Sequence, residues 1–385
     1  MSVGLISENF KKHFGQSPEW IIQAPGRINL IGEHIDYLEG FVMPAAIDRF
    51  LTMAVRANGT DQANIWTSQV CDDSPVSFSL VDLKPFEGDL YWLNYIGGVA
   101  EMIRREGTEL AGFDAVITTD LPTGAGLSSS AALETASALA VEAVTGSKFD
   151  PVRRAELCQK AEHEFAGVPC GIMDQMAVGL GQKNHALMLD CRYNSWNPVF
   201  IPSGIAIIVS DTRVSHALGD GEYRKRRESC DSALEIIDKS SWRDVSESDL
   251  EDKEPELGPL LYRRTRHVVS EMKRVPAMRD ALSSGHPNTV AEIMKSGHKS
   301  LRDDYEVSCP ELDLLVEAAY EFGTGLVGAR MTGGGFGGST VSLVHEGSAE
   351  ALKAHLEDRF RAAFDAEPNC FITRIADGAS IQTFN

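Results

Sequence analysis

The sequence predicts a mixed α+β protein with two lobes, and three observations support this fold class. Segments with helical and strand periodicity alternate along the chain, and a hairpin signal occurs near its end. The length of 385 residues allows two lobes of roughly 100 to 200 residues each. The order of the segments fits an α+β arrangement better than a doubly wound parallel sheet. We expect the boundary between residues 185 and 205, with an N-terminal lobe of 1–195 and a C-terminal lobe of 196–385.

The N-terminal half contains alternating strand and helix signals. Short runs of apolar and β-branched residues predict strands at 20–23, 50–55 and 113–118. Apolar residues at helical spacing predict helices at 91–105 and 129–144. Pro25 and Gly26 are expected to end the first strand in a loop. Asp150 is expected to cap a further helix whose first position is Pro151.

The C-terminal half combines strands with longer amphipathic helices. A buried strand is predicted at 205–210, and amphipathic helical stretches at 229–237 and 262–272. The acidic, serine-containing segment 238–256 is expected to be a solvated connection without a chemical role. Ser348 is expected to cap a helix that runs to Phe364, and Asp377-Gly378 to join two apolar strands in a hairpin.

The composition is that of a folded protein with an acidic surface. Hydrophobic residues make up 43% and charged residues 24% of the chain, within the ordinary range of globular proteins. Lys and Arg total 36 against 56 Asp and Glu, so the formal charge is -20. Such a field repels nucleic acid and anionic membranes, and we expect neither as a partner. A bound nucleotide would therefore need its phosphates to be met locally by backbone N–H groups, a helix N-terminus and a metal ion.

The cysteines and the N-terminal residues predict a cytoplasmic location. Seven cysteines are scattered without a C-x-x-C pair, and an odd count argues against a disulfide framework. Residues 1–12 contain no apolar signal-peptide region, and no stretch approaches the roughly 20 apolar residues of a membrane span.

Two glycine-rich loops are the first candidates for chemistry. The loop 122–132 joins a predicted strand to a helix and combines glycines with three serine hydroxyls at 128–130. Its free N–H groups and the helix dipole would stabilise a phosphate, although it lacks the Lys of the G-x-x-x-x-G-K-[ST] pattern and does not match G-x-G-x-x-G. A glycine turn before a helix capped by serine oxygens would have the same pattern. The second loop, 333–338, has five glycines in six positions, which fits close packing or a place beside the phosphates.

The segment 26–48 is a third candidate, because it is too rich in charged and polar residues for a plain connection. Glu33, His34 and Asp36 fall within four positions, and their acceptors and donors suit sugar hydroxyls. A transition-metal site is the rival interpretation, but no His or Cys cluster elsewhere in the sequence completes it.

Taken together, these segments resemble the motifs of galactokinases, within the GHMP family of small-molecule kinases. The sugar motif, the phosphate loop and the third family motif correspond to residues 26–37, 124–132 and 328–338. Further similar stretches extend the resemblance over nearly the whole chain, at 168–175, 222–227 and 264–269. The resemblance implies a two-lobed GHMP fold, with a ribosomal-S5-like N-terminal lobe, a ferredoxin-like C-terminal lobe and the site between them.

By resemblance, Asp174 is the catalytic carboxylate that faces the sugar C1 hydroxyl, and Arg27 lies beside it. A carboxylate can accept the hydroxyl proton during phosphoryl transfer, while a guanidinium can neutralise the transferred group or hold the carboxylate ionised. Which role Arg27 has stays open at this point, as does whether Asp174 acts as a base or mainly positions charge. By itself, an Asp in this apolar stretch would be interpreted as a helix cap.

The resemblance also implies a sugar pocket and a nucleotide site. The sugar would be bound by Glu33, His34, Asp36, the Gly171 backbone and the Tyr223 hydroxyl. ATP would be bound by the phosphate-loop residues Gly124, Ala125, Gly126, Leu127, Ser128, Ser129, Ser130 and Ala131. Glu162, which would otherwise be interpreted as a surface charge, would share Mg²⁺ with Ser130 or else with Ser129. Trp66 and Trp92 are candidates for the wall of the adenine pocket, with core packing as the alternative.

The activity implied is the ATP- and Mg²⁺-dependent phosphorylation of α-D-galactose at C1 by a monomer. Galactokinases usually have His-Thr-Asp-Tyr-Asn in the sugar motif, where this chain has Ile35 and Leu38 in place of Thr and Asn. These apolar residues either repack the loop or admit another sugar, such as arabinose, N-acetylgalactosamine or a uronic acid. The alternative from another class is a sensor that binds ATP and sugar without turnover, although a sensor would not need Asp174, Arg27 and Glu162 together.

Overall fold

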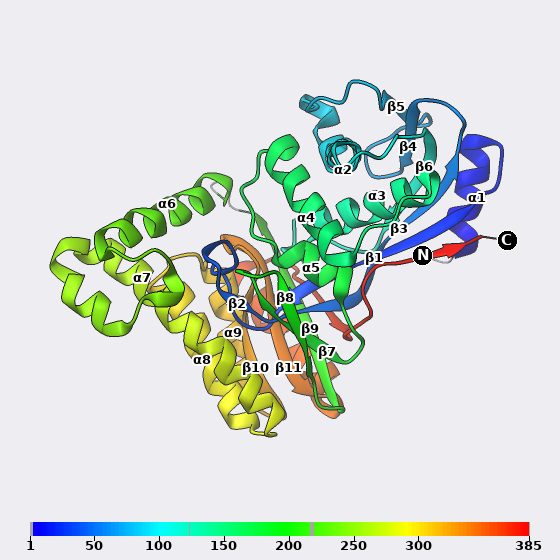
Figure 1. Ribbon diagram of the computed structural model, residues 1–385. Coiled ribbons are helices and arrows are strands. Elements are labelled where there is room, and N and C mark those ends of the chain that lie inside the picture. Colours follow the sequence, from blue (N-terminus) through cyan, green and yellow to red (C-terminus); the bar gives the residue numbers. More distant parts are fainter. Residues whose placement is uncertain (1–2, 123, 216–218, 385) are drawn as a thin grey trace.

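The computed structural model describes residues 3–122, 124–215 and 219–384, without the side chains of 3, 215, 219, 220 and 223. In this part of the chain, helices cover three β-sheets, and the helices α6 (Gly219–Ile237) and α7 (Glu247–Ser283) extend to one side (Figure 1). The predicted α+β class is therefore confirmed. The division into lobes at residue 195 stays a prediction.

A six-stranded sheet dominates the N-terminal half, with the strand order β13-β1-β3-β6-β4-β5. Its strands are β1 (Trp20–Asn29), β3 (Pro44–Ala57), β4 (Gln62–Thr67), β5 (Val76–Ser79), β6 (Phe113–Thr119) and β13 (Ser380–Thr383). Side chains alternate across the sheet, as the period of two requires. Ile22 and Met53 belong to the main core, while Ile21 and Ala54 pack under α1 (Val3–Phe14) on the opposite face. Both faces of the sheet are therefore covered.

Four helices lie on the face opposite α1: α2 (Asn94–Arg105), α3 (Ser129–Thr145), α4 (Pro151–Ala161) and α5 (Met173–Leu180). Helices α3 and α5 pack directly on β1 and β3, and α2 and α4 pack behind them. The α3 sequence is rich in Ala and ends at Gly146, whose φ of 76° is the left-handed conformation that glycine favours. The Asp150 side chain accepts a hydrogen bond from the Val152 N–H and Pro151 begins α4, as predicted.

A four-stranded antiparallel sheet lies in the C-terminal half, with the order β10-β11-β9-β12. Its strands are β9 (Ile205–Ser215), β10 (Leu326–Thr332), β11 (Gly337–His345) and β12 (Asn369–Thr373). It is covered by α8 (Pro287–Asp303), α9 (Pro310–Phe322) and α10 (Ala349–Phe364). The second glycine-rich loop is the connection between β10 and β11, so this sheet fixes its position.

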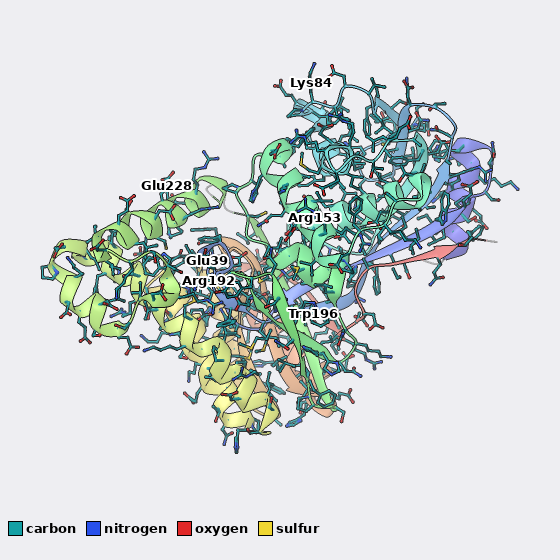
Figure 2. The ribbon with its side chains drawn as sticks, viewed as in Figure 1. Glu39, Lys84, Arg153, Arg192, Trp196 and Glu228 are labelled. Atoms are coloured by element: carbon teal, nitrogen blue, oxygen red, sulfur yellow. The ribbon has the colours of Figure 1, made fainter. Side chains whose placement is uncertain are left out.

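A small third sheet consists of β2 (Phe41–Val42), β7 (His185–Asp190) and β8 (Ser195–Phe200), and α7 packs against it. An ion pair joins the loop before β2 to the β7–β8 turn, with Arg192 Nε 3.0 Å from Glu39 Oε2 (Figure 2). Among the described helices, none is long and apolar enough to cross a membrane. All seven cysteines are free thiols.

Strands β12 and β13 belong to different sheets, so the hairpin predicted at Asp377-Gly378 is wrong. Strand β12 pairs with β9, whereas β13 pairs with β1 at the edge of the N-terminal sheet. The turn residues instead hold the crossing chain in place. The Asp377 side chain accepts a hydrogen bond from Lys183 N–H, and a Cβ on Gly378 would lie 2.8 Å from the Gly179 carbonyl oxygen.

Three further local predictions differ from the structure. Strand β1 does not end at Pro25 but continues to Asn29, because an irregularity of register after Pro25 lets the pairing with β3 resume. The segment 238–256 is partly helical: it contains a short 3₁₀ helix at Trp242–Asp244 and the start of α7, which a Ser246 capping box fixes. Ser348 precedes α10 as expected, but its side chain makes no capping hydrogen bond.

Candidate active site

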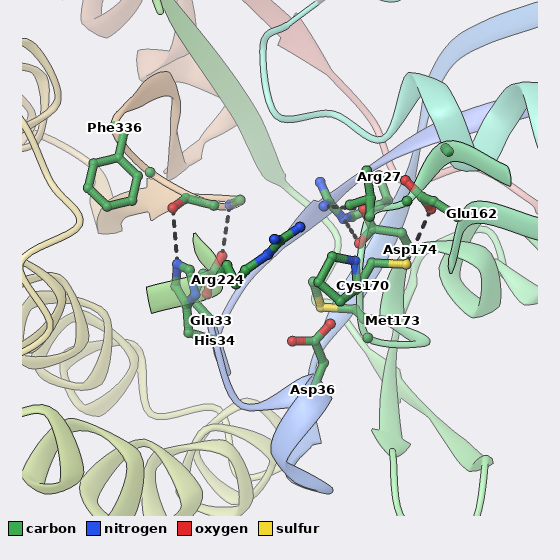
Figure 3. A pocket seen from close by; sticks show the side chains of 18 of the residues that line it. Arg27, Glu33, His34, Asp36, Glu162, Cys170, Met173, Asp174, Arg224 and Phe336 are labelled. Carbon is green, nitrogen blue, oxygen red and sulfur yellow. Dashed lines mark hydrogen bonds and ion pairs between the residues drawn. The ribbon is translucent and has the colours of Figure 1, made fainter. Parts of the chain in front are cut away.

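A cavity of about 490 Å³ is lined by seven of the residues predicted for the site. Its walls come from β1 and the loop after it, the segment before α5, the β10–β11 loop and α6 (Figure 3). The predicted residues that line it are Arg27, Glu33, His34, Asp36, Glu162, Gly171 and Asp174. They come from segments that are far apart in the sequence, so the fold itself assembles them.

Arg27 and Asp174 form a two-point ion pair on the cavity wall. Nε of Arg27 donates to Oδ1 of Asp174 at 2.8 Å, and Nη2 donates to Oδ2 at 2.6 Å. The third guanidinium nitrogen, Nη1, donates to the Gly126 carbonyl oxygen at 2.5 Å. The Asp174 side chain is 28% exposed and that of Arg27 only 6%, so a ligand in the cavity reaches the carboxylate more easily than the guanidinium.

The predicted phosphate loop turns tightly before α3. Gly124 and Gly126 have φ values of 76° and 71°, and Ser128 has 60°, all in the left-handed region. The Ser128 hydroxyl does not cap the helix, because it donates to Oδ2 of Asp174. The first N–H groups of α3, from Ser129 onward, have no acceptor inside the helix. They are therefore available to bind an anion, aided by the positive end of the helix dipole.

The second glycine-rich loop packs against the phosphate loop. The Ser339 hydroxyl donates to the Ala125 carbonyl oxygen at 2.7 Å. A Cβ on Gly333 would lie 3.1 Å from the Gly126 carbonyl oxygen, so a side chain there would press on the phosphate loop. The C-terminal sheet thus supports the loop through contacts that require glycine.

Glu162 is buried beside Asp174 and close to the start of α3. Burial, and then the negative charge of Asp174, raise the pKa of Glu162 to about 7, and a hydrogen bond with the Ser130 hydroxyl is among the contacts that lower it. One carboxylate and one hydroxyl suit a Mg²⁺ ion that also takes phosphate oxygens and water. Among the described residues, no group of three or more His, Cys, Asp or Glu side chains could hold a metal ion by itself. The donor set therefore fits a metal ion that the nucleotide shares.

Glu134 and Gln175 form a buried layer behind Glu162 that the sequence analysis missed. Nε2 of Gln175 donates to Glu162 at 2.7 Å and to Glu134 at 3.0 Å. Burial, and then the charge of Glu162, raise the pKa of Glu134 well above its usual value. Gln175 is adjacent to Asp174 in the sequence, but Glu134 is 41 residues from Gln175, so no local pattern indicated the contact.

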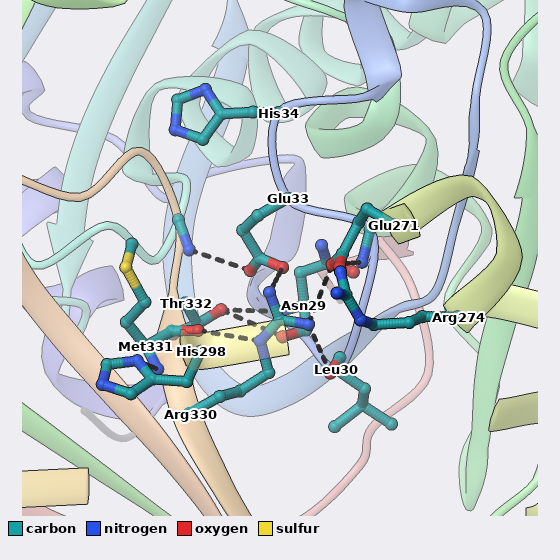
Figure 4. A network of polar contacts seen from close by, with 12 residues as sticks. Asn29, Leu30, Glu33, His34, Glu271, Arg274, His298, Arg330, Met331 and Thr332 are labelled. Carbon is teal, nitrogen blue, oxygen red and sulfur yellow. Dashed lines mark hydrogen bonds and ion pairs between the residues drawn. The ribbon is translucent and has the colours of Figure 1, made fainter. Parts of the chain in front are cut away.

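A buried ion-pair network holds Glu33 at the edge of the cavity (Figure 4). Arg330 is fully buried, with Nη2 2.8 Å from Glu33 Oε2 and Nη1 3.1 Å from Glu271 Oε1. Against the effect of burial, Arg330 and Arg274 lower the pKa of Glu271 to about 2. Gly333 N–H donates to the other Glu33 oxygen, which joins the sugar motif to the second glycine-rich loop. Sequence analysis did not identify Arg330.

His34 connects the same two segments. Its backbone φ is 63°, and its Nε2 lies 3.0 Å from the Gly334 carbonyl oxygen. Burial lowers the pKa of His34 to about 3, so the ring is neutral near pH 7. Nε2 therefore donates to Gly334, and Nδ1 accepts from the Tyr37 hydroxyl at 3.0 Å.

Asp36 lies directly against Gly171. A Cβ on Gly171 would lie 2.0 Å from Asp36 Oδ2, so only glycine allows this approach. Burial, followed by the charge of Asp174, raises the pKa of Asp36 to about 6. The neighbouring Ile35 and Leu38 are 0% and 5% exposed and belong to the hydrophobic core rather than to the cavity lining. The two departures from the sugar motif therefore repack the loop.

Trp66, Trp92 and residues 124–131 of the phosphate loop are not among the residues that line the cavity. The Tyr223 side chain lies outside the described part of the chain. The Trp66 ring stacks on His13 with 4.0 Å between centroids, and its Nε1 donates to the Asp72 carbonyl oxygen, so it has a packing role under α1. Trp92 packs against the main core. The geometry gives neither tryptophan a contact with the cavity, and Tyr91 lines it instead.

Comparison with known proteins identifies the family. The galactokinase galactose-binding signature matches residues 8–57, and the GHMP kinase N-terminal and C-terminal domains match 94–182 and 278–362. A galactokinase of Roseiflexus sp. strain RS-1 is 39% identical over 383 residues, covering 98% of this chain and 97% of the relative. The chain belongs to the galactokinase family. The human galactokinase is also 39% identical, over 97% of this chain and 94% of its own length.

Solved structures agree with membership of the galactokinase family. The crystal structure of Lactococcus lactis galactokinase complexed with galactose superposes with a TM-score of 0.93, at 30% identity, and covers 98% of this chain and 99% of that one. A mevalonate kinase superposes with a TM-score of 0.66 at 18% identity, which shows the shared fold alone. The GHMP fold and a kinase activity expected from the motifs are thus confirmed for this galactokinase-family chain.

Proposed function

We propose that this chain transfers the γ-phosphoryl group of ATP to the C1 hydroxyl of α-D-galactose, which yields galactose 1-phosphate and ADP. The observation that carries the proposal is the Arg27–Asp174 pair, with 2.6 and 2.8 Å contacts, in a cavity that also holds Glu33, His34 and Asp36. Arg27 and Ser128 tie this pair to the phosphate loop on the other side. A sugar hydroxyl and a terminal phosphate can therefore meet beside Asp174.

Asp174 accepts the proton of the sugar hydroxyl as that oxygen attacks the γ-phosphorus. The new O–P bond forms while the bond from phosphorus to the bridging oxygen of the β-phosphate breaks, and ADP leaves with that electron pair. Arg27 orients the carboxylate, because Nε and Nη2 are both bonded to Asp174 and Nη1 is bonded to Gly126. We assign Arg27 to positioning Asp174 rather than to the phosphate.

Galactose is the favoured acceptor. A galactokinase solved with galactose shares the fold of this chain at a TM-score of 0.93. Ile35 and Leu38, which differ from the usual sugar motif, are buried in the core and do not line the cavity. Asp36, held against Gly171, and the neutral His34 supply hydrogen-bonding groups for the sugar, and Tyr223 is retained as a further candidate.

The nucleotide phosphates are bound by the N–H groups of residues 124–131 at the start of α3. Glu162 and Ser130 are the protein groups that would hold Mg²⁺ together with phosphate oxygens. A magnesium ion bound there neutralises phosphate charge and orients the phosphates. Residues 168–171, which line the cavity with Tyr91, limit the access of water to the reacting groups.

A coupled assay of ADP release with a panel of sugars tests the proposal. We expect turnover with galactose that exceeds turnover with arabinose, N-acetylgalactosamine and galacturonate. A preference for one of these other sugars would contradict galactose as the substrate. Thermal stabilisation by galactose and ATP without ADP release would instead support the sensor alternative.

A further inference from the structure

Arg224 is a cavity-lining guanidinium for which the proposed reaction has no role yet. It is an exposed residue of α6 and contributes to the cavity wall together with Arg27, Asp174 and the β10–β11 loop. Figure 3 shows its side chain between His34 and the Arg27–Asp174 pair. Within the described residues, its side chain has no hydrogen bond or ion pair.

The other basic residues of the 222–227 motif all have partners. Lys225 pairs with Glu222 at 2.7 Å, and Arg226 pairs with the same carboxylate at 2.8 Å. Arg227 donates to the Pro169 carbonyl oxygen at 3.2 Å. Arg224 therefore differs from its neighbours in presenting an uncompensated positive charge to the cavity.

The proposed ATP site lacks a fixed cation for the terminal phosphate. The phosphate loop contains no Lys or Arg between residues 122 and 132, and the whole chain carries a formal charge of -20. Arg27 is already bonded through all three guanidinium nitrogens. Because Glu162 and Asp174 add negative charge close to the loop, a triphosphate needs positive charge beyond that of a shared metal ion.

We propose that Arg224 binds the terminal phosphate of the nucleotide and is the fixed cation that the phosphate loop lacks. This inference rests on the ATP site of the proposed function and adds a binding residue to it. Arg224 can form two parallel hydrogen bonds to a phosphate, which a lysine cannot.

The carboxylate of an acidic sugar has the same chemistry as a phosphate, but the site favours the nucleotide. The sugar side of the cavity already contains the carboxyl group of Asp36, which would repel the carboxylate of an acidic sugar. Arg224 also lines an adjoining hollow of about 490 Å³, which shares Gly167 and Pro169 with the main cavity. Arg227, Glu228 and Asp231 also line this hollow, so its lining has charges of both signs.

Binding measurements on the full chain with Arg224→Gln test the inference. Calorimetric titration with a non-hydrolysable ATP analogue, with ADP and with galactose separates the terminal phosphate from the rest of the ligands. We expect Arg224→Gln to bind the ATP analogue roughly 10- to 100-fold more weakly. This is the loss of affinity typical when a hydrogen bond to a charged group is removed. ADP and galactose should bind as they do to the wild type, and Arg224→Lys should recover part of the loss.

Lys225→Gln is the matched control, because it removes the same charge from the next residue of α6, where the side chain is 64% exposed and points to Glu222. It should bind all three ligands like the wild type. Equal binding of the ATP analogue by Arg224→Gln and wild type would overturn the inference. Galacturonate is titrated as a fourth ligand. Loss of galacturonate binding by Arg224→Gln, with its nucleotide binding intact, would also overturn the inference. Because binding is measured without turnover, a wild type that phosphorylates no sugar would contradict the proposed function but not this assignment.

Discussion

The carboxylates of Glu134 and Glu162 share a single donor, the side-chain amide of Gln175, which lies 3.0 Å from one and 2.7 Å from the other. Glu134 is fully buried, and burial together with the negative charge of Glu162 raises its pKa well above the usual value of a glutamate. The amide thus fixes the carboxylate that faces the phosphate loop.

The first prediction concerns this amide. Gln175→Leu should lower the free energy of unfolding by about 1 to 3 kcal/mol, because Oε2 of the buried Glu134 loses its donor. Glu162 keeps the Cys170 thiol and the Ser130 hydroxyl as partners. Urea unfolding monitored by fluorescence measures the change. Gln382→Leu on the exposed strand β13 is the control and should leave the urea unfolding midpoint unchanged. Replacing both Gln175 and Glu134 by Leu should cost less than the two single effects combined, and strict additivity would contradict a coupled network.

The second prediction concerns the metal ligand. Glu162→Gln should raise the Mg²⁺ concentration needed for half-maximal activity by roughly tenfold or more, because a neutral amide binds Mg²⁺ poorly. Titration of Mg²⁺ at a fixed ATP concentration measures the effect. Glu164→Gln is the matched control, because Glu164 lies two residues from Glu162, is 47% exposed and pairs with Arg105. Its Mg²⁺ requirement should match that of the wild type. An unchanged Mg²⁺ requirement in Glu162→Gln would exclude it as a ligand.

The third prediction concerns the proton acceptor. Asp174→Asn keeps the shape of the side chain but cannot take the hydroxyl proton, so kcat should fall roughly 10²- to 10⁴-fold. Galactose and nucleotide binding should be retained, because other residues line both sides of the cavity. Asp358→Asn on α10, where the side chain is 75% exposed, should keep full activity. Wild-type turnover in Asp174→Asn would falsify the assignment.

Sequence reasoning singled out those parts of the candidate site whose residues are close together in the chain. The phosphate loop is a glycine turn followed by a helix, and Glu33, His34 and Asp36 share one short segment, so their patterns are local. The motif resemblance then pointed to Asp174 as the catalytic candidate. The residues that hold these groups in place have no such pattern, as the buried pair of Arg330 and Glu271, 59 residues apart, illustrates.

The errors have a common physical cause, which is that tertiary contacts override local preference. Asp377-Gly378 has the sequence of a turn, but the strands before and after it pair with different sheets. Strand β12 pairs at the edge of one sheet and β13 at the edge of the other. Serine often caps helices, yet the Ser128 hydroxyl bonds to a carboxylate 46 residues away. Trp66 has the size of an adenine-binding residue, yet it fills the space under α1.

The fourth prediction concerns the buried Arg330. Arg330→Met should lower the free energy of unfolding by about 3 to 5 kcal/mol, because Glu33 and Glu271 would remain buried without their shared cation. Denaturant unfolding measures the loss. Arg361→Met removes a guanidinium of 48% exposure from α10, and its unfolding midpoint should match that of the wild type. Equal midpoints for the two variants would show that the buried network adds nothing to stability.

The fifth prediction is a pH dependence that originates at His267. Burial lowers the pKa of His267 to about 4 in the folded chain, against 6.5 for the unperturbed side chain. Its Nε2 donates to the Glu33 carbonyl oxygen, at the foot of the sugar motif. Between these two pKa values, His267 is protonated in the unfolded chain but neutral in the folded chain. The free energy of unfolding therefore decreases as the pH falls below 6.5.

The size of this effect follows from the two pKa values. Acidification from pH 7.5 to 5 should cost about 2 kcal/mol through this residue alone. His267→Gln keeps a donor toward Glu33 but cannot titrate, so the variant should lose about 2 kcal/mol less than the wild type over the same range. Urea unfolding of both proteins at pH 7.5, 6 and 5 measures the difference. Because other acidic groups titrate equally in both chains, parallel curves would mean that His267 is protonated in the folded state as readily as in the unfolded one.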